Sequence, residues 1–240
     1  MNTTKATPKT PWGRFPSAWV TSGGLAKFQV QQKASLAALR VYLAMACWTA
    51  RQEFAETPGI FMAFSVTYND LQRNSHSDRS ELLPALTLLQ EQGLLKFGNA
   101  GRGTRNVYEV LGDSSKGWSK VPETVLDKFE SLNLKHTTVA SHNRRQVLLD
   151  GLKLYILFLA LRDKRLNRAK VSYDRICELT GIRRRGVRTA LSLLASLKLV
   201  HIENFRNPEQ PGPNHYFIVD LAKFQPLPGF EYDDGQRQAG

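Results

Sequence analysis

The chain contains 240 residues, with 33 lysines and arginines against 21 aspartates and glutamates, so its formal charge is 33 − 21 = +12. A composition of 42% hydrophobic and 22% charged residues excludes general disorder, and two widely separated cysteines, Cys47 and Cys177, exclude a disulfide framework or a cysteine metal site. No stretch approaches the roughly 18 apolar residues of a membrane span, so we expect a cytoplasmic protein. Its basic charge favours nucleic acid as the partner, ahead of an anionic membrane surface.

The two halves of the chain share motifs in the same order, beginning with WGRFP at 12–16 and WSKVP at 118–122. Further on, VTYNDL from Val66 matches VSYDRI from Val171, an offset of 171 − 66 = 105 residues. LTLLQEQGLL matches LSLLASLKLV at the same offset without a gap. Self-similarity at a fixed spacing indicates a repeated structural unit.

The repeat predicts two domains of similar size. We place them at residues 12–112 and 118–225, with a polar linker at 113–117 and flexible tails at 1–11 and 226–240.

Apolar residues at helical spacing predict that each repeat opens with a long core helix, from Leu36 to Ala46 and from Leu148 to Leu159. A second, shorter helix follows in each repeat and begins at Thr67 or Ser172, whose hydroxyl can accept hydrogen bonds from free backbone N–H groups. In the second repeat a glycine turn then leads to a third helix, at about residues 183–198.

Each repeat ends in two β-prone segments that flank a loop rich in Gly, Pro or Asn. The segments are residues 94–98 and 107–111 in the first repeat and 200–205 and 215–219 in the second. Helix, helix, turn, helix and hairpin is the order of a winged helix. We therefore predict an α+β fold, mostly α with small β-hairpins, made of two tandem winged helix-turn-helix domains.

The start of the third helix in the second repeat is predicted to read DNA, because a helix-turn-helix presents this end to the major groove. The residues concerned are Arg183, Arg184, Arg185, Arg188 and Thr189. Arginine forks match phosphate oxygens and the guanine O6/N7 pair. Arginines at a helix N-terminus oppose the macrodipole, so a purely solvated basic cap is the weaker interpretation. The surrounding residues 135–188 contain 14 basic and 4 acidic side chains, a charge of 14 − 4 = +10.

The equivalent helix of the first repeat is less basic. Arg79 and Ser80 occupy the equivalent positions, but Asp78 and Glu81 bring negative charge, and Pro84 should kink the helix or delay its start. We expect the first repeat to bind DNA more weakly. The alternative is that it pairs with another protein.

Further DNA contacts are expected outside the third helices. The wings supply Arg102, Arg105, Arg206 and Asn214, and contacts to the DNA backbone are assigned to Tyr68, Tyr173, Arg165 and Arg168. For the two tyrosines, partial burial in the core is an equal alternative. Trp12 and Trp118 are interpreted as core anchors rather than base-stacking platforms.

Enzymatic motifs are missing from the sequence. There is no GxxxxGK[ST] phosphate loop, and no pair of histidines flanks a hydrophobic residue as in metal-dependent nicking initiators. HNRR at 142–145 has the HxxR spacing of tyrosine recombinases, but no C-terminal tyrosine stands in a suitable context. We expect no catalysis, no metal and no cofactor.

A family resemblance rests on five segments: the two Trp-x-basic-x-Pro openings, LKLYILFLALR at 152–162, the run from Val171 to Val200, and HYFIV at 215–219. Together they resemble the winged-helix domains of plasmid and phage replication initiators, including replication protein O and DnaD-like N-terminal domains. The resemblance spans nearly the whole chain. It implies a bacterial protein, associated with the nucleoid or a plasmid, that binds repeated or palindromic double-stranded DNA sites and recruits host replication proteins. By the same match, Arg184, Arg185, Arg188 and Thr189 take the recognition-helix positions.

Two other functions are compatible with the same sequence features. A transcriptional regulator would use the same fold and the same contacts. A protein-interaction adaptor, of the helicase-loader or partition type, would bind DNA without sequence preference. Either a monomer that reads two half-sites or a homodimer fits the repeat.

Overall fold

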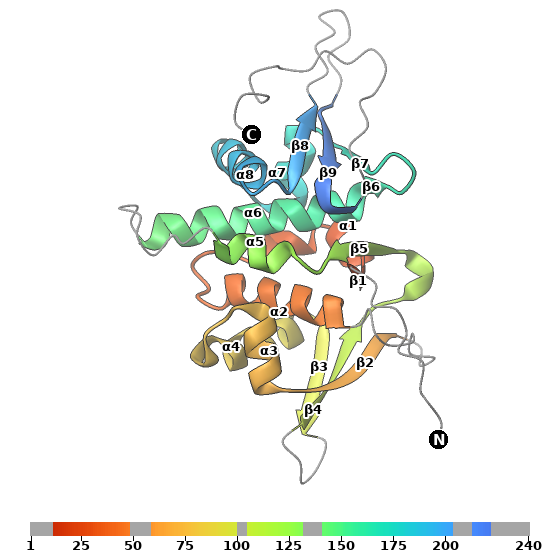
Figure 1. Ribbon diagram of the computed structural model, residues 1–240, viewed down its shortest axis with the longest axis vertical. Coiled ribbons are helices and arrows are strands. Elements are labelled where there is room, and N and C mark those ends of the chain that lie inside the picture. Colours follow the sequence, from red (N-terminus) through yellow and green to blue (C-terminus); the bar gives the residue numbers. More distant parts are fainter. Residues whose placement is uncertain (1–11, 49–58, 100–104, 132–140, 204–212, 222–240) are drawn as a thin grey trace, which may run out of the picture. The chain divides into compact units, whose positions relative to one another are not determined.

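The computed structural model describes residues 12–48, 59–99, 105–131, 141–203 and 213–221. In these ranges the helices are accompanied by antiparallel sheets of two, three and four strands, which confirms the predicted α+β class (Figure 1). The chain divides into two compact units: Met1–Pro16 with Ala37–Glu130, and Ser17–Leu36 with Ser131–Gly240.

These units differ from the predicted domains, 12–112 and 118–225. In each repeat, the segment that directly precedes the first long helix belongs to the unit of the other repeat, and we call this segment the arm. Residues 17–36 belong to the second unit, and residues 113–130 belong to the first. The cause lies in the packing of the arms. The arm at 17–36 contacts helices of the second unit, and the strand at 118–122 pairs with the strand at 12–16.

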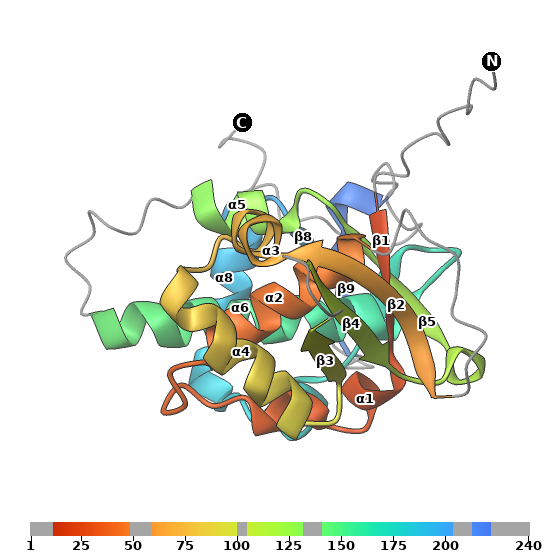
Figure 2. The same ribbon diagram turned by 90° about the horizontal axis from the view of Figure 1, so that it is seen from below.

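The first unit combines four α-helices and one short 3₁₀ helix with a two-stranded and a three-stranded sheet in the part of the chain that the structure describes. Its elements are β1 (Trp12–Pro16), α2 (Ser35–Trp48), β2 (Ile60–Thr67), α3 (Tyr68–Ser75), α4 (Arg79–Glu91), β3 (Leu95–Asn99), β4 (Arg105–Leu111), η3 (Ser114–Lys116), β5 (Trp118–Pro122) and α5 (Val125–Ser131). The sheet order is β2-β4-β3, and α2, α3 and α4 gather on one side of this sheet (Figures 1 and 2). Tyr42, Phe61 and Tyr108 are fully buried in its core.

The second unit places its helices beside a four-stranded sheet of order β6-β7-β9-β8. Its elements are α1 (Ala18–Thr21), η1 (Gly24–Lys27), α6 (Ser141–Leu161), β6 (Arg162–Asp163), β7 (Arg168–Lys170), α7 (Tyr173–Thr180), α8 (Arg184–Ser196), β8 (Val200–Glu203), β9 (His215–Ile218) and η5 (Val219–Leu221). In the core, the rings of Phe158 and Tyr216 stack with centroids 4.1 Å apart. The inward face of α8 buries Val187, Leu191 and Leu194, as the sequence predicts.

The second and third helices of the two repeats begin and end at the same offset. From α3 to α7 the first residue moves by 173 − 68 = 105 positions, and from α4 to α8 by 184 − 79 = 105. Both predicted caps are confirmed, because Thr67 accepts a hydrogen bond from the Asp70 N–H and Ser172 accepts one from the Arg175 N–H.

The backbone of the turn before α4 and α8 is also repeated. His76 and Gly181, at the offset 181 − 76 = 105, both adopt the left-handed conformation, with φ of 49° and 69°. Pro84 lies inside α4, which begins at Arg79, so the expectation of a delayed start is wrong. Because proline has no N–H group, the carbonyl oxygen of Ser80, four residues earlier, lacks its helical hydrogen-bond donor. Ser80 is exposed, so water can hydrate this oxygen.

Candidate nucleic-acid interface

The N-terminal end of α8 presents a basic surface in the second unit. All five predicted residues, Arg183, Arg184, Arg185, Arg188 and Thr189, are exposed, while the opposite side of the helix is buried. The first turn contains no acidic residue. The arginine charges therefore add to the positive end of the helix dipole, which makes this end attractive to an anion.

Arg184 differs from its neighbours because it is already engaged. Its Nη1 pairs with Asp174 Oδ1, and its guanidinium lies 5.7 Å from the centre of the Tyr173 ring. Arg183, Arg185 and Arg188 form no ion pair with any residue that the structure describes. These three arginines are thus the side chains whose charge is available to a phosphate or a base.

Arg168 has a structural role, which corrects the prediction that it contacts the DNA backbone. Its Nε and Nη2 donate to the two carboxylate oxygens of Glu203 at 2.7 and 3.0 Å, and both side chains are almost completely buried. Arg165, three residues earlier, lies in an exposed turn between β6 and β7.

The tyrosines assigned to phosphate contacts, Tyr68 and Tyr173, are both half-buried at the start of α3 and α7. The ring of Tyr173 is covered in part by Arg184. Both alternatives given for these residues, a hydroxyl contact or partial burial, are compatible with this position.

Of the predicted wing residues, Asn214 is half-buried and lies just before β9. Its Nδ2 lies 3.4 Å from the Tyr216 hydroxyl, and Asn106 makes the same contact with Tyr108 at 3.3 Å in the first repeat. Arg102 and Arg206 lie outside the described residues, and Arg105 is described only as part of strand β4. Asn214 therefore lies at the loop end of the β8-β9 hairpin.

The equivalent end of α4 in the first unit has a different chemistry. Arg79 donates to Asn69 Oδ1 at 3.3 Å, which repeats the Arg184–Asp174 contact with a neutral acceptor. Ser80 is exposed, as predicted. Leu83 occupies the position of Arg188 and is 56% exposed. This end of α4 thus carries one arginine, two acidic residues and an exposed leucine where α8 carries four arginines.

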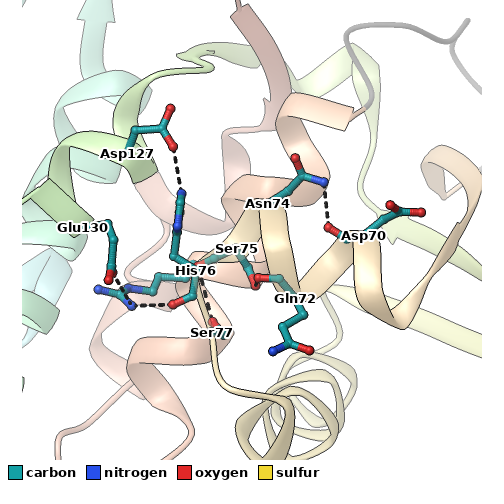
Figure 3. A network of polar contacts seen from close by, with 9 residues as sticks. Asp70, Gln72, Asn74, Ser75, His76, Ser77, Asp127 and Glu130 are labelled. Atoms are coloured by element: carbon teal, nitrogen blue, oxygen red, sulfur yellow. Dashed lines mark hydrogen bonds and ion pairs between the residues drawn. The ribbon is translucent and has the colours of Figure 1, made fainter.

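A polar network around the turn before α4 was not anticipated from the sequence (Figure 3). The carbonyl oxygen of His76 accepts a hydrogen bond of 2.9 Å from Arg40. The imidazole Nε2 of His76 lies 2.8 Å from Asp127 Oδ1 on α5. Arg40 also lies 3.8 Å from Glu130. Desolvation lowers the pKa of Arg40, against the opposing effect of Glu130. The arm that joins the first unit therefore holds the turn that positions α4.

In the second unit the arm contacts the equivalent turn by van der Waals packing. A Cβ atom at Gly181 would lie 3.3 Å from Ala26. Because Gly181 also has a positive φ, the close approach of the arm and the turn geometry both favour glycine there. Nothing in the local sequence signals that an arm from the other repeat contacts either turn.

Trp12 and Trp118, interpreted as core anchors, are half-buried and stack on each other across the β1-β5 pair, with ring centroids 6.3 Å apart. Arg14 lies over both rings, and Lys120 lies 4.0 Å from the Trp12 ring centre. The two tryptophans therefore fasten β5 to β1 within the first unit.

No helix in the described part of the chain has both the length and the apolar composition to cross a membrane. Within the same residues, no three side chains of His, Cys, Asp or Glu are grouped as metal ligands. Comparison with protein-family models, with curated proteins and with solved structures gives no match for this chain.

Proposed function

We propose that the protein is a sequence-specific double-stranded DNA-binding protein of a plasmid or phage, and that it acts as a replication initiator that recruits host factors. In this proposal each repeat is a winged helix-turn-helix domain. The observation that carries it is the exposed set of Arg183, Arg185, Arg188 and Thr189 at the N-terminal end of α8, in which no arginine has an acidic partner among the described residues. The order of α6, α7, α8 and the β8-β9 pair also supports it.

The two kinds of contact would have different roles. Arginine contacts to phosphates supply affinity that falls with salt and does not depend on sequence. Arg185 and Arg188, with Thr189 beside them, supply discrimination if they reach base edges. Arg184 has a positioning role, because Asp174 and Tyr173 already hold it.

The direct test is selection of bound sequences from a random duplex library by the purified full-length chain, with affinity for the selected site measured against salt. We expect a motif bound at least roughly a thousandfold more tightly than bulk DNA. Its length reports whether one repeat or both read bases. Binding that falls steeply with salt while no motif emerges would remove the specific reader and leave non-specific affinity.

The position of the selected site distinguishes a replication initiator from a transcriptional regulator. The site of an initiator lies at an origin, and the site of a regulator lies at a promoter. No catalytic step, metal or cofactor is part of this proposal.

A second role is favoured for the first unit, namely contact with a host replication protein. Asp78, Glu81 and the exposed Leu83 replace Arg183, Gly186 and Arg188 on α4, and these residues suit a protein surface better than a phosphate backbone. The test is binding of the purified host helicase or initiator to the chain and to Leu83→Asp. Loss of that complex with unchanged DNA affinity supports this role, whereas an unchanged complex excludes α4 as the contact.

A further inference from the structure

A pocket of about 950 Å³ opens beside the N-terminal end of α8, entirely within the second unit. Its lining comes from the arm segment 26–31, from residues 143–153 of α6, and from residues 181–189. Pockets of about 300–1,000 Å³ are typical of sites for small molecules. The DNA contacts proposed above do not account for Asp150 and Lys153, two buried residues of the pocket lining.

Lys153 places a buried ammonium group in this pocket. It is 4% exposed, and among the residues that the structure describes it has no hydrogen bond and no ion pair. Burial lowers the pKa of Lys153 to about 8, so the amine is still largely protonated at pH 7. Lys153 Nζ is not one of the buried side-chain atoms that lack a hydrogen-bond partner, so solvent in the pocket reaches the ammonium group, and a ligand atom that accepts a hydrogen bond would take the place of that water.

Asp150 lies one turn earlier on α6 and is 6% exposed. Its Oδ1 accepts a hydrogen bond of 2.7 Å from Gln146, and desolvation raises its pKa. No described side chain donates to Oδ2. At Gly186 a Cβ atom would lie 3.1 Å from this oxygen, so glycine lets α8 approach the carboxylate closely. Residues three apart on a helix are neighbours, so one hydrogen-bond donor and one acceptor face the same pocket.

The rest of the lining suits an anionic polar ligand. Arg183 and Arg185 are exposed at the edge of the pocket, and the amide side chains of Gln29, Gln31 and Asn143 offer both donors and acceptors. With Lys153 and Asp150 included, the formal charge of the lining is 3 − 1 = +2. A ligand that fits must therefore combine negative charge with an edge that both donates and accepts hydrogen bonds.

We propose that this pocket binds a nucleotide, with its phosphate at Arg183 and Arg185 and the polar edge of its base at Asp150 and Lys153. Every nucleobase carries a donor beside an acceptor, which matches the carboxylate and the ammonium group. The same chemistry is offered by a free mononucleotide and by an unpaired nucleotide of a single DNA strand. The inference rests on the proposed function in one respect, because Arg183 and Arg185 are assigned to duplex DNA as well. A bound nucleotide and a duplex should therefore weaken each other's binding by the same factor.

The test is calorimetric titration of the purified full-length chain, without duplex DNA, with each of the four deoxynucleoside monophosphates. Ribose 5-phosphate and inorganic phosphate are the matched probes that lack the base. We expect saturable binding of a nucleotide at least tenfold tighter than that of either probe. Equal binding of all probes would leave an anion site only and overturn the proposal, as would no saturable nucleotide binding up to about 1 mM.

Variants locate the site. Lys153→Met and Asp150→Asn should each weaken nucleotide binding at least tenfold, while Lys170→Met, which removes an exposed lysine on β7, should not. Arg185→Gln changes an exposed residue, and it serves as the second variant if circular dichroism shows that Lys153→Met does not fold. Folded variants that bind like the wild type would exclude this pocket.

A single-stranded oligonucleotide distinguishes the two sources of the ligand. Tighter binding of the strand, in competition with the mononucleotide, identifies an unpaired nucleotide, and tighter binding of the mononucleotide identifies a free one. Because these titrations use no duplex, their failure leaves the duplex-selection result standing. Nucleotide binding without a selected duplex motif would overturn only the proposed function.

Discussion

Arg168 and Glu203 form a bidentate ion pair in the interior of the second unit, with Nε and Nη2 at 2.7 and 3.0 Å from the carboxylate oxygens. The two residues come from β7 and β8, which are separated in the sheet by β9. The guanidinium crosses above the β9 residue Phe217, at 5.3 Å from its ring centre. The pair therefore ties three strands together with side chains that are 5% and 0% exposed.

Breaking this pair should destabilise the protein strongly. Glu203→Gln removes the negative charge and leaves the buried Arg168 guanidinium without its anionic partner, so we expect the free energy of unfolding to fall by about 3–5 kcal/mol in urea titrations. The double variant Arg168→Met with Glu203→Leu replaces both charges by apolar groups and should be more stable than either single change. A single variant as stable as the wild type would show that the pair contributes little.

The end of α8 offers a stabilising change suggested by the repeat. Lys198 has a φ of 53°, and the residue at the equivalent place after α4, Gly93, has a φ of 68°. A side chain in this left-handed region costs roughly 1 kcal/mol relative to glycine. Lys198→Gly should therefore raise the free energy of unfolding by about that amount, and Gly93→Ala should lower it. Thermal unfolding of both variants shows whether Lys198→Gly stabilises the protein and Gly93→Ala destabilises it.

Local sequence patterns were sufficient for the helices and their caps. The predicted third helix, 183–198, is observed as Arg184–Ser196, and the caps at Thr67 and Ser172 are observed with their hydrogen bonds. These features depend on residues three or four positions apart, so a single sequence contains the necessary information.

Long-range contacts were not predictable in the same way. The pairing of β1 with β5 joins residues that are more than 100 positions apart, and the two tryptophan motifs carry no signal of which strand each would join. The burial of Arg168 was missed for the same reason, because its partner Glu203 lies 35 residues away. In the basic segment 162–168 nothing distinguishes this arginine from the exposed Arg165.

Arginines at the N-terminal end of α8 should differ in their effect on DNA binding. Arg185 and Arg188 have no acidic partner among the described residues, so Arg185→Ala should cost about 1–3 kcal/mol and relax one position of the selected site if it reads a base. Arg184 is held by Asp174, so Arg184→Ala should cost less. Arg73→Gln, which removes one positive charge from α3 of the first unit, is the control. Equal losses for Arg184, Arg185 and Arg73 variants would indicate a general charge effect only.

The buried amine of Lys153 should make stability depend on pH in the alkaline range. Its pKa is about 8 in the folded protein against 10.5 ordinarily, so between these values the unfolded chain holds a proton that the folded chain has lost. Unfolding then takes up a proton, and the folded state gains stability as pH rises from 8 to 10.5. The difference of 10.5 − 8 = 2.5 corresponds to a gain of up to about 3 kcal/mol for wild type relative to Lys153→Met. Burial also raises the pKa of Tyr216, but this residue is present in both proteins and cancels in the difference. Urea unfolding of wild type and Lys153→Met measures the effect, and Lys170→Met is the control for loss of an exposed lysine. Parallel stability curves for wild type and Lys153→Met from pH 7 to 10 would contradict the prediction.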